Sequence, residues 1–247
     1  MSETWIVGIN PVEGALANDP ERVREVLTEQ GSKNARVGEI ADAARKLKIP
    51  VKPVAREQLE KLGGEVRHQG VIARYDVPPL RGENDLPDLL EAAGANALVL
   101  VLDGVTDPHN LGACLRSAAA ANVTAVVVPK DRAVGITPTV RRASAGGADL
   151  VPVIAATNLA RAMRMLKDAG VWITGLDGDT EQSIYGIDLK GPIALVMGSE
   201  GDGMRRLTRD TCDFVARIPM PGSMESLNVS VATGIVLFEA LRQRGGK

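Results

Sequence analysis

The chain has 247 residues, enough for one large domain or two smaller ones, and 45% of them are hydrophobic. Only six residues are Phe, Trp or Tyr, so we expect an aliphatic, alanine-rich core of the kind that helices form on a parallel sheet. The net charge of −2 does not by itself indicate a nucleic-acid-binding chain, and two histidines with two distant cysteines, Cys114 and Cys212, leave no plausible zinc set.

The same composition bears on where the protein works. No apolar run is long enough to span a bilayer, and the first residues lack the pattern of a secretory signal. Two unpaired thiols suit a reducing compartment. We therefore expect a cytoplasmic protein that binds neither a membrane nor a metal.

The first 76 residues predict a small α/β domain. Short apolar runs at 5–8, 51–54 and 70–74 favour strands. A helix is expected to begin near residue 11, and 35–47 has apolar residues at the spacing of one helical face. After this domain, residues 77–96 are acidic and rich in proline, which predicts a linker that ends in a short helix over 86–93.

Residues 97–247 alternate strands with helices more regularly. The uninterrupted apolar run at 97–102 is typical of a buried parallel strand, and further strands are expected at 125–128, 171–174 and 193–197. Helices are expected at 111–121, 158–169 and 230–244. This alternation predicts a parallel sheet covered by helices on both faces.

Three polar or glycine-rich loops follow predicted strands, at 103–116, 197–203 and 218–230. Ligands of open parallel sheets bind outside the carboxyl ends of the strands, so these loops are the candidate site. Each has an ordinary alternative: Asn110 could cap its helix, Arg116 could pack its stem on the core, and Glu200 could be a plain loop carboxylate. The glycines of 198–203 lack the spacing of a dinucleotide fingerprint and suit the close approach of a bulky ligand.

Taken together, the three loops resemble the motifs of the SPOUT methyltransferases, in particular the SpoU/TrmH class. Asn110, Gly112 and Arg116 match the first motif, although Asn122 stands where that motif usually ends in glycine. Gly198, Glu200 and Gly203 match the second motif. The third and most specific match comprises Ile218, Pro219, Met220, Gly222, Ser226, Leu227, Asn228, Val229, Ser230 and Ala232.

The resemblance implies S-adenosylmethionine-dependent methylation of a ribose 2′-hydroxyl. The amino-acid sequences of the motifs are most similar to those of class members that methylate a guanosine in large-subunit (23S) ribosomal RNA. It also implies a small N-terminal RNA-binding domain, a C-terminal SPOUT domain with a deep trefoil knot, and a homodimer. A transfer-RNA methyltransferase of the same class and a non-catalytic RNA-binding protein of ribosome assembly remain the alternatives.

The same resemblance implies the roles of individual residues. Asn110, Arg116, Glu200 and Asn228 would be catalytic. Arg116, the only cation in the three loops, would act either as the base or, less demandingly, as a stabiliser of the developing alkoxide. The cofactor would be held at Gly198, Gly201, Ile218, Met220 and Leu227.

Contact with RNA must come from local basic groups, because the net charge is slightly negative and aromatic stacking platforms are few. The candidates are Lys130, Arg132, Arg141, Arg142, Arg205 and Arg206, each of which could equally belong to an ordinary solvated surface. The last expected helix has an apolar stripe at 231, 235, 238 and 241, wide enough to cover the sheet and still meet a partner subunit.

Overall fold

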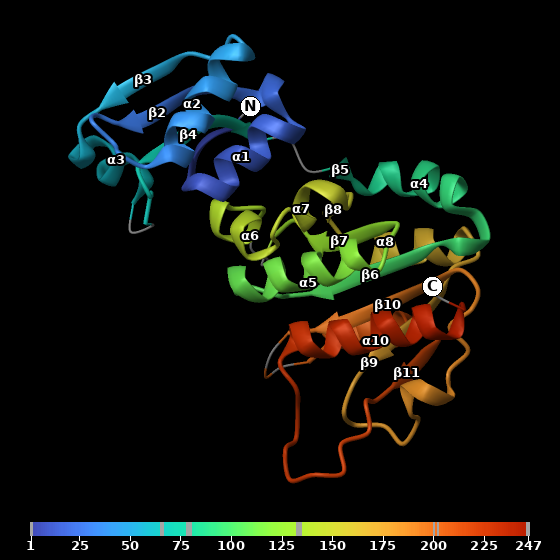
Figure 1. Ribbon diagram of the computed structural model, residues 1–247. Helices are drawn as coiled ribbons and strands as arrows, with labels where there is room; N and C mark the ends of the chain where they lie inside the picture. Colours follow the sequence, from blue (N-terminus) through green and yellow to red (C-terminus); the bar gives the residue numbers. More distant parts are fainter. Residues whose placement is uncertain are drawn as a thin grey trace. The chain divides into compact units, whose positions relative to one another are not determined.

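The computed structural model describes residues 2–64, 67–77, 81–131, 135–199, 201 and 203–245. The chain divides into two compact units, residues 1–79 and 80–247 (Figure 1). Among the described residues, no helix combines the length and the apolar character needed to cross a membrane.

The first unit is a four-stranded sheet with helices on both faces. Its order is β1-β4-β2-β3, in which β4 is antiparallel to β1 and β2 while β3 is parallel to β2. Helices α1 and α2 pack on one face and α3 on the other. Its elements are β1 (Ser2–Val7), α1 (Ile9–Asn18), β2 (Val23–Glu29), α2 (Ala35–Lys46), β3 (Val51–Val54), α3 (Arg56–Gly63) and β4 (Val71–Val77).

The small α/β fold predicted for this region is confirmed, with one strand and one helix added. The sequence did not predict β2, because Arg24 and Glu25 interrupt its apolar pattern. In the structure both charges are paired across the sheet, Arg24 with Asp76 and Glu25 with Lys52. These ion pairs satisfy the charged side chains of β2, while its apolar residues enter the cores on both faces of the sheet, Val23 and Val26 on one face and Leu27 on the other.

The second unit is a seven-stranded parallel sheet in the order β11-β9-β10-β6-β7-β8-β5. Its strands are β5 (Arg81–Gly82), β6 (Leu98–Asp103), β7 (Ala125–Pro129), β8 (Val153–Ala156), β9 (Trp172–Leu176), β10 (Ile193–Gly198) and β11 (Phe214–Ala216). Its helices are α4 (Leu86–Ala93), α5 (Pro108–Ala120), α6 (Pro138–Ala143), α7 (Gly147–Leu150), α8 (Leu159–Asp168), α9 (Arg206–Thr211) and α10 (Val229–Gln243).

Helices cover both faces of this sheet, which confirms the predicted architecture. The core on one face is formed with α5 and α10, and the core on the other face with α4 and α8. Every residue of the central strand β6 is buried, as its uninterrupted apolar run predicts. The knot that the resemblance implies stays a prediction.

The segment expected to be a linker differs from that expectation. Residues 81–96 belong to the second unit, where β5 pairs with β8 and α4 adds Leu86 and Leu90 to the core. Glu83 is only 4% exposed; its carboxylate accepts a 2.7 Å hydrogen bond from the backbone N–H of Thr157 and pairs with Arg161. One of the acidic residues of this segment is therefore buried and paired. Composition alone does not distinguish such a residue from the exposed acidic residues of a linker.

Candidate active site

The carboxyl ends of β6 and β10 are neighbours in the sheet, with Asp103 opposite Gly198 in register. The first two candidate loops leave the sheet at these two residues. The third loop joins β11 to α10, and α10 packs against α5, the helix that the first loop enters. Loops that are distant in sequence therefore meet at one edge of the sheet, as the strand pattern predicts.

A direct hydrogen bond joins the first and third motifs. The side-chain Nδ2 of Asn228 donates to Oδ1 of Asn110 at 2.9 Å. Asn228 also begins α10, because its Oδ1 accepts hydrogen bonds from the backbone N–H (2.9 Å) and the hydroxyl (2.6 Å) of Ser230. The two amides are thus held in a fixed orientation.

The structure also tests the interpretation of Asn110 as a helix cap. The cap of α5 is Asp107, whose Oδ1 accepts from the backbone N–H of Asn110 at 2.8 Å. The interpretation of Asn110 as the capping residue is therefore wrong. Its side chain is instead directed to Asn228, where it can orient a substrate or cofactor group.

Arg116 lies further along α5 with an exposed side chain, and it makes no hydrogen bond or ion pair with another described residue. Two glycines set the position of its helix. A Cβ at Gly112 would stand 2.4 Å from Cβ of Ala143, and one at Gly147 would stand 2.9 Å from Cα of Arg116. The helices α6 and α7 can therefore pack directly on α5, while the side chain of Arg116 remains exposed to a ligand.

The second loop folds tightly back on itself. Ser199 and Gly203 exchange two backbone hydrogen bonds of 3.0 and 3.1 Å. A Cβ at Gly198 would lie 2.2 Å from the carbonyl carbon of Gly203, so only glycine permits this closure. Gly201 at the tip has φ +88, the left-handed region that glycine favours. Glu200 lies outside the described residues.

The third loop leaves the sheet and returns to it at α10 (Figure 1). Ile218 and Met220 are half-buried at its start, whereas residues 221–228 are all exposed. Leu227, next to the paired Asn228, is 38% exposed. A loop with exposed apolar side chains beside two oriented amides suits a ligand with both apolar and polar parts.

Sequence reasoning missed a buried carboxylate at this edge. Asp103 ends β6 with a side chain 0% exposed, and it binds Arg205, 102 residues away. Its Oδ2 accepts the backbone N–H of Arg205 at 2.9 Å and its Oδ1 accepts Nε at 2.6 Å. The pair ties the start of the first loop to the segment after the second. The sequence feature that could have indicated this pair is an aspartate directly after a predicted buried strand.

The basic candidates for RNA contact fall into two groups. Arg205 pairs with Asp103. Arg141, whose side chain is only 11% exposed, pairs with Asp149, so both arginines form ion pairs within the protein. Lys130, Arg142 and Arg206 are exposed. Arg132 lies outside the described residues.

The described part of the chain contains no group of three or more His, Cys, Asp or Glu side chains arranged to hold a metal ion. Burial, together with the charge of the neighbouring Asp213, raises the pKa of the Cys212 thiol to about 12. Cys114 is fully buried. Neither thiol is therefore a nucleophile at neutral pH.

Known protein families and individual proteins match nearly the whole chain. A family model described as the SpoU rRNA Methylase family matches residues 97–238, and one described as RNA 2′-O ribose methyltransferase substrate binding matches residues 5–79. The chain is 61% identical to the 23S rRNA (guanosine-2′-O-)-methyltransferase RlmB of Xylella fastidiosa (strain 9a5c), over 97% of this chain and 96% of that protein. A relative with the same description from Pseudomonas aeruginosa is 49% identical over 97% of this chain and 96% of its own.

Solved structures with the same fold span both units. The SpoU methyltransferase AviRb from Streptomyces viridochromogenes, in complex with the cofactor AdoMet, gives a TM-score of 0.79 at 24% identity over 98% of this chain and 90% of its own. The AdoMet-bound rRNA methyltransferase from Sinorhizobium meliloti gives a TM-score of 0.78 at 25% identity, over 97% and 87% of the two chains.

Proposed function

Since this chain belongs to the SpoU rRNA methylase family, we propose that it transfers a methyl group from S-adenosylmethionine to the ribose 2′-hydroxyl of a guanosine in 23S rRNA. One observation of the structure carries the proposal. The 2.9 Å hydrogen bond between Asn110 and Asn228 joins two of the three motifs at the sheet edge where ligands of this architecture bind.

The loops fit a bulky cofactor. The tight turn at Gly198 and the exposed residues 221–228 leave backbone and apolar side chains open to a ligand. S-adenosylmethionine supplies a methyl carbon made electrophilic by its sulfonium. In this proposal it is held by Gly198, Gly201, Ile218, Met220 and Leu227.

The protein's part in the reaction is to orient the hydroxyl and to stabilise its developing charge. In this proposal Arg116 donates its guanidinium N–H groups to the ribose oxygen as negative charge appears there. Asn110 and Asn228 orient the reacting groups with amides that both donate and accept. The carboxylate of Glu200 holds Arg116 or a ribose hydroxyl.

The test is methyl transfer in vitro. Purified protein and labelled S-adenosylmethionine are incubated with 23S rRNA or tRNA from cells that lack this protein, and the methylated ribose is mapped. We expect one labelled guanosine in 23S rRNA and no label in tRNA. Label in tRNA alone, or cofactor binding without transfer to either RNA, would refute the proposal in favour of one of the two alternatives.

We also propose that the exposed basic groups Lys130, Arg142 and Arg206 contact RNA phosphates, together with Arg132. Lysine and arginine at a surface bind phosphates in a salt-dependent way. Arg142→Ala should therefore weaken RNA binding and lower its dependence on salt, while the affinity for S-adenosylmethionine stays unchanged.

A homodimer is the proposed assembly. One face of α10 packs in the core through Val236, Leu237 and Ala240. The opposite face carries Val231 and Phe238, each 51% exposed and seven residues apart. We expect Phe238→Glu to give a monomer in light scattering, and Tyr185→Glu, at a side chain that is also 51% exposed, to leave the dimer intact. A wild-type monomer at micromolar concentration would refute the assembly.

We place the protein in the cytoplasm, because ribosomal RNA is its proposed substrate.

A further inference from the structure

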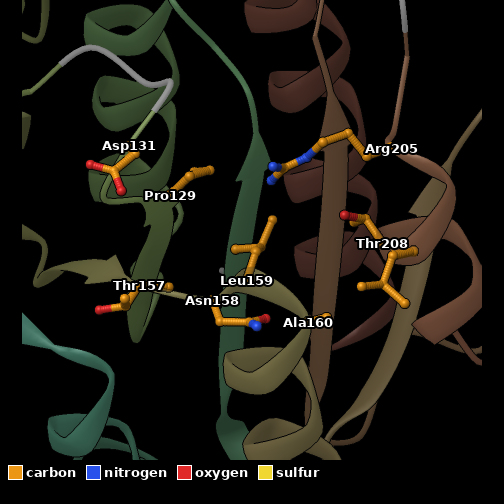
Figure 2. Close-up of a pocket in the computed structure, with 10 residues that line it drawn as sticks. Pro129, Asp131, Thr157, Asn158, Leu159, Ala160, Arg205 and Thr208 are labelled. Carbon is orange, nitrogen blue, oxygen red and sulfur yellow. The ribbon is translucent and has the colours of Figure 1, made fainter.

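We propose that a pocket of the catalytic unit, on the α8 side of the sheet, binds a nucleobase of the RNA close to the methylated nucleotide. The inference rests on the proposed function and extends it to a binding site for a second nucleotide. The pocket has a volume of about 410 Å³ (Figure 2). That volume is within the range of small-ligand sites.

The pocket lies where two strands end. Pro129 is the last residue of β7 and Ala156 the last of β8, and both line it together with the first residues of α8. Arg205 and Thr208 form the opposite wall. The pocket thus lies at the carboxyl edge of the sheet, the same edge at which Asn110 and Asn228 are paired. It is on the face covered by α8, whereas α5 and α10 cover the other face.

Polar groups face the space from both walls. Thr208 is only 3% exposed, and its hydroxyl makes no hydrogen bond with any described residue. Figure 2 shows that side chain and the amide of Asn158 on opposite sides of the pocket. Oδ1 of Asn158 already caps α8 through a 3.0 Å bond from the N–H of Arg161, which leaves its Nδ2 as a donor. Because Thr208 lines the pocket, a polar group of a ligand can form a hydrogen bond with this hydroxyl.

The charge of the lining excludes a phosphate as the preferred ligand. Among the described lining residues the cation is Arg205, which is neutralised by Asp103, and the carboxylate of Asp131 is exposed. A neutral group that both donates and accepts hydrogen bonds fits better. Pro129 and Leu159 add apolar surface against which a flat ring can pack.

A nucleobase has these properties, since its edge donates and accepts and its faces are apolar. Sequence-specific recognition of RNA relies on bases that are splayed out of the helix and bound in this way. Asp103 begins the first candidate loop and pairs with Arg205 in the pocket wall, so one ion pair connects the pocket to that loop. A base held here would therefore fix the register of the RNA at the reacting ribose.

The test uses the full-length protein and a 23S rRNA fragment containing the mapped guanosine. A set of fragments carries one abasic nucleotide at each flanking position in turn. Thr208→Val removes the unpartnered hydroxyl and keeps the shape of the side chain. Thr211→Val is the matched control, because Thr211 is on the same helix but donates its hydroxyl to the carbonyl of Leu207 at 2.7 Å. Asn158→Asp, which keeps the helix cap and loses the Nδ2 donor, tests the opposite wall.

We expect the wild-type protein to lose about tenfold in affinity for one abasic fragment, the scale of one lost base contact. Thr208→Val and Asn158→Asp should bind the intact fragment about tenfold more weakly and be insensitive to that same abasic position. The affinity for S-adenosylmethionine and the melting temperature should stay unchanged, and Thr211→Val should behave as wild type.

Two results would overturn the proposal. If Thr208→Val and Asn158→Asp discriminate all fragments as wild type does, the pocket holds no base. If they weaken binding of S-adenosylmethionine instead, the pocket belongs to the cofactor. Methylation of the intact fragment by the wild-type protein is measured in the same experiment, so failure of the proposed function is recognised separately.

Discussion

Replacing Arg205 with methionine would leave the Asp103 carboxylate buried without its counter-charge. The side chain of Asp103 is 0% exposed, and of its bonds to Arg205 only the one from the backbone N–H would remain. Removal of one partner from a buried ion pair costs about 3–5 kcal/mol. For a protein of this size each kcal/mol lowers the melting temperature by about 2–4 °C, so we expect a fall of about 6–20 °C.

The reverse change should cost less. Asp103→Asn leaves the Arg205 side chain, which is 48% exposed, free to bind water, so a loss of about 1–2 kcal/mol is expected. The double variant has no buried charge at these two positions and should be about as stable as Asp103→Asn alone. This asymmetry follows from the unequal burial of the two partners.

The assay is urea and thermal unfolding of the wild type, both single variants and the double variant. Arg206→Met is the control, because the neighbouring side chain is 95% exposed and should change stability by no more than about 0.5 kcal/mol. Additive effects of the two single changes, or an Arg205→Met variant as stable as the control, would refute the reasoning.

Three further outcomes are expected. Arg116→Ala should lower the rate of methyl transfer at least about 100-fold in a single-turnover assay, with cofactor affinity by calorimetry unchanged; retention of a tenth of the rate would contradict its role. Gly112→Ala should destabilise by about 1–3 kcal/mol in urea unfolding, because the close approach of α6 outweighs the better helix propensity of alanine. Hydrogen bonds from Arg242, then Gln243, lower the pKa of Glu239 from 4.5 to about 2, so its contribution to stability is present above about pH 4.5 and is lost as the pH falls through 2. Glu239→Gln should flatten the loss of stability between pH 5 and about 2, and an unchanged pH profile would count against this.

The sequence predicted the elements that are buried on both sides or strongly periodic. The run at 97–102 and the face of 35–47 became β6 and α2 almost at their predicted bounds. Elements whose stability depends on partners distant in sequence escaped prediction. β11 has only three residues and exposes Phe214, so its pairing with β9 decides its conformation.

The site follows the same division. The glycine and asparagine motifs indicated the three loops, because each motif is local in the sequence. The Asp103–Arg205 pair and the choice of Asp107 over Asn110 as helix cap depend on three-dimensional neighbours. A capping preference alone favours aspartate and asparagine about equally, so only the geometry separates them.

Residues 81–96 lie between the two matched family models, yet they complete the sheet and core of the second unit. This limits how the two domains can be exchanged among relatives. A hybrid that fuses a foreign first domain, ending where the first matched model ends, directly to residue 97 would lack β5 and leave β8 as an open strand edge, beside a core without Leu86 and Leu90. Such an edge is a template for aggregation, so a functional chimera has to be joined before Arg81.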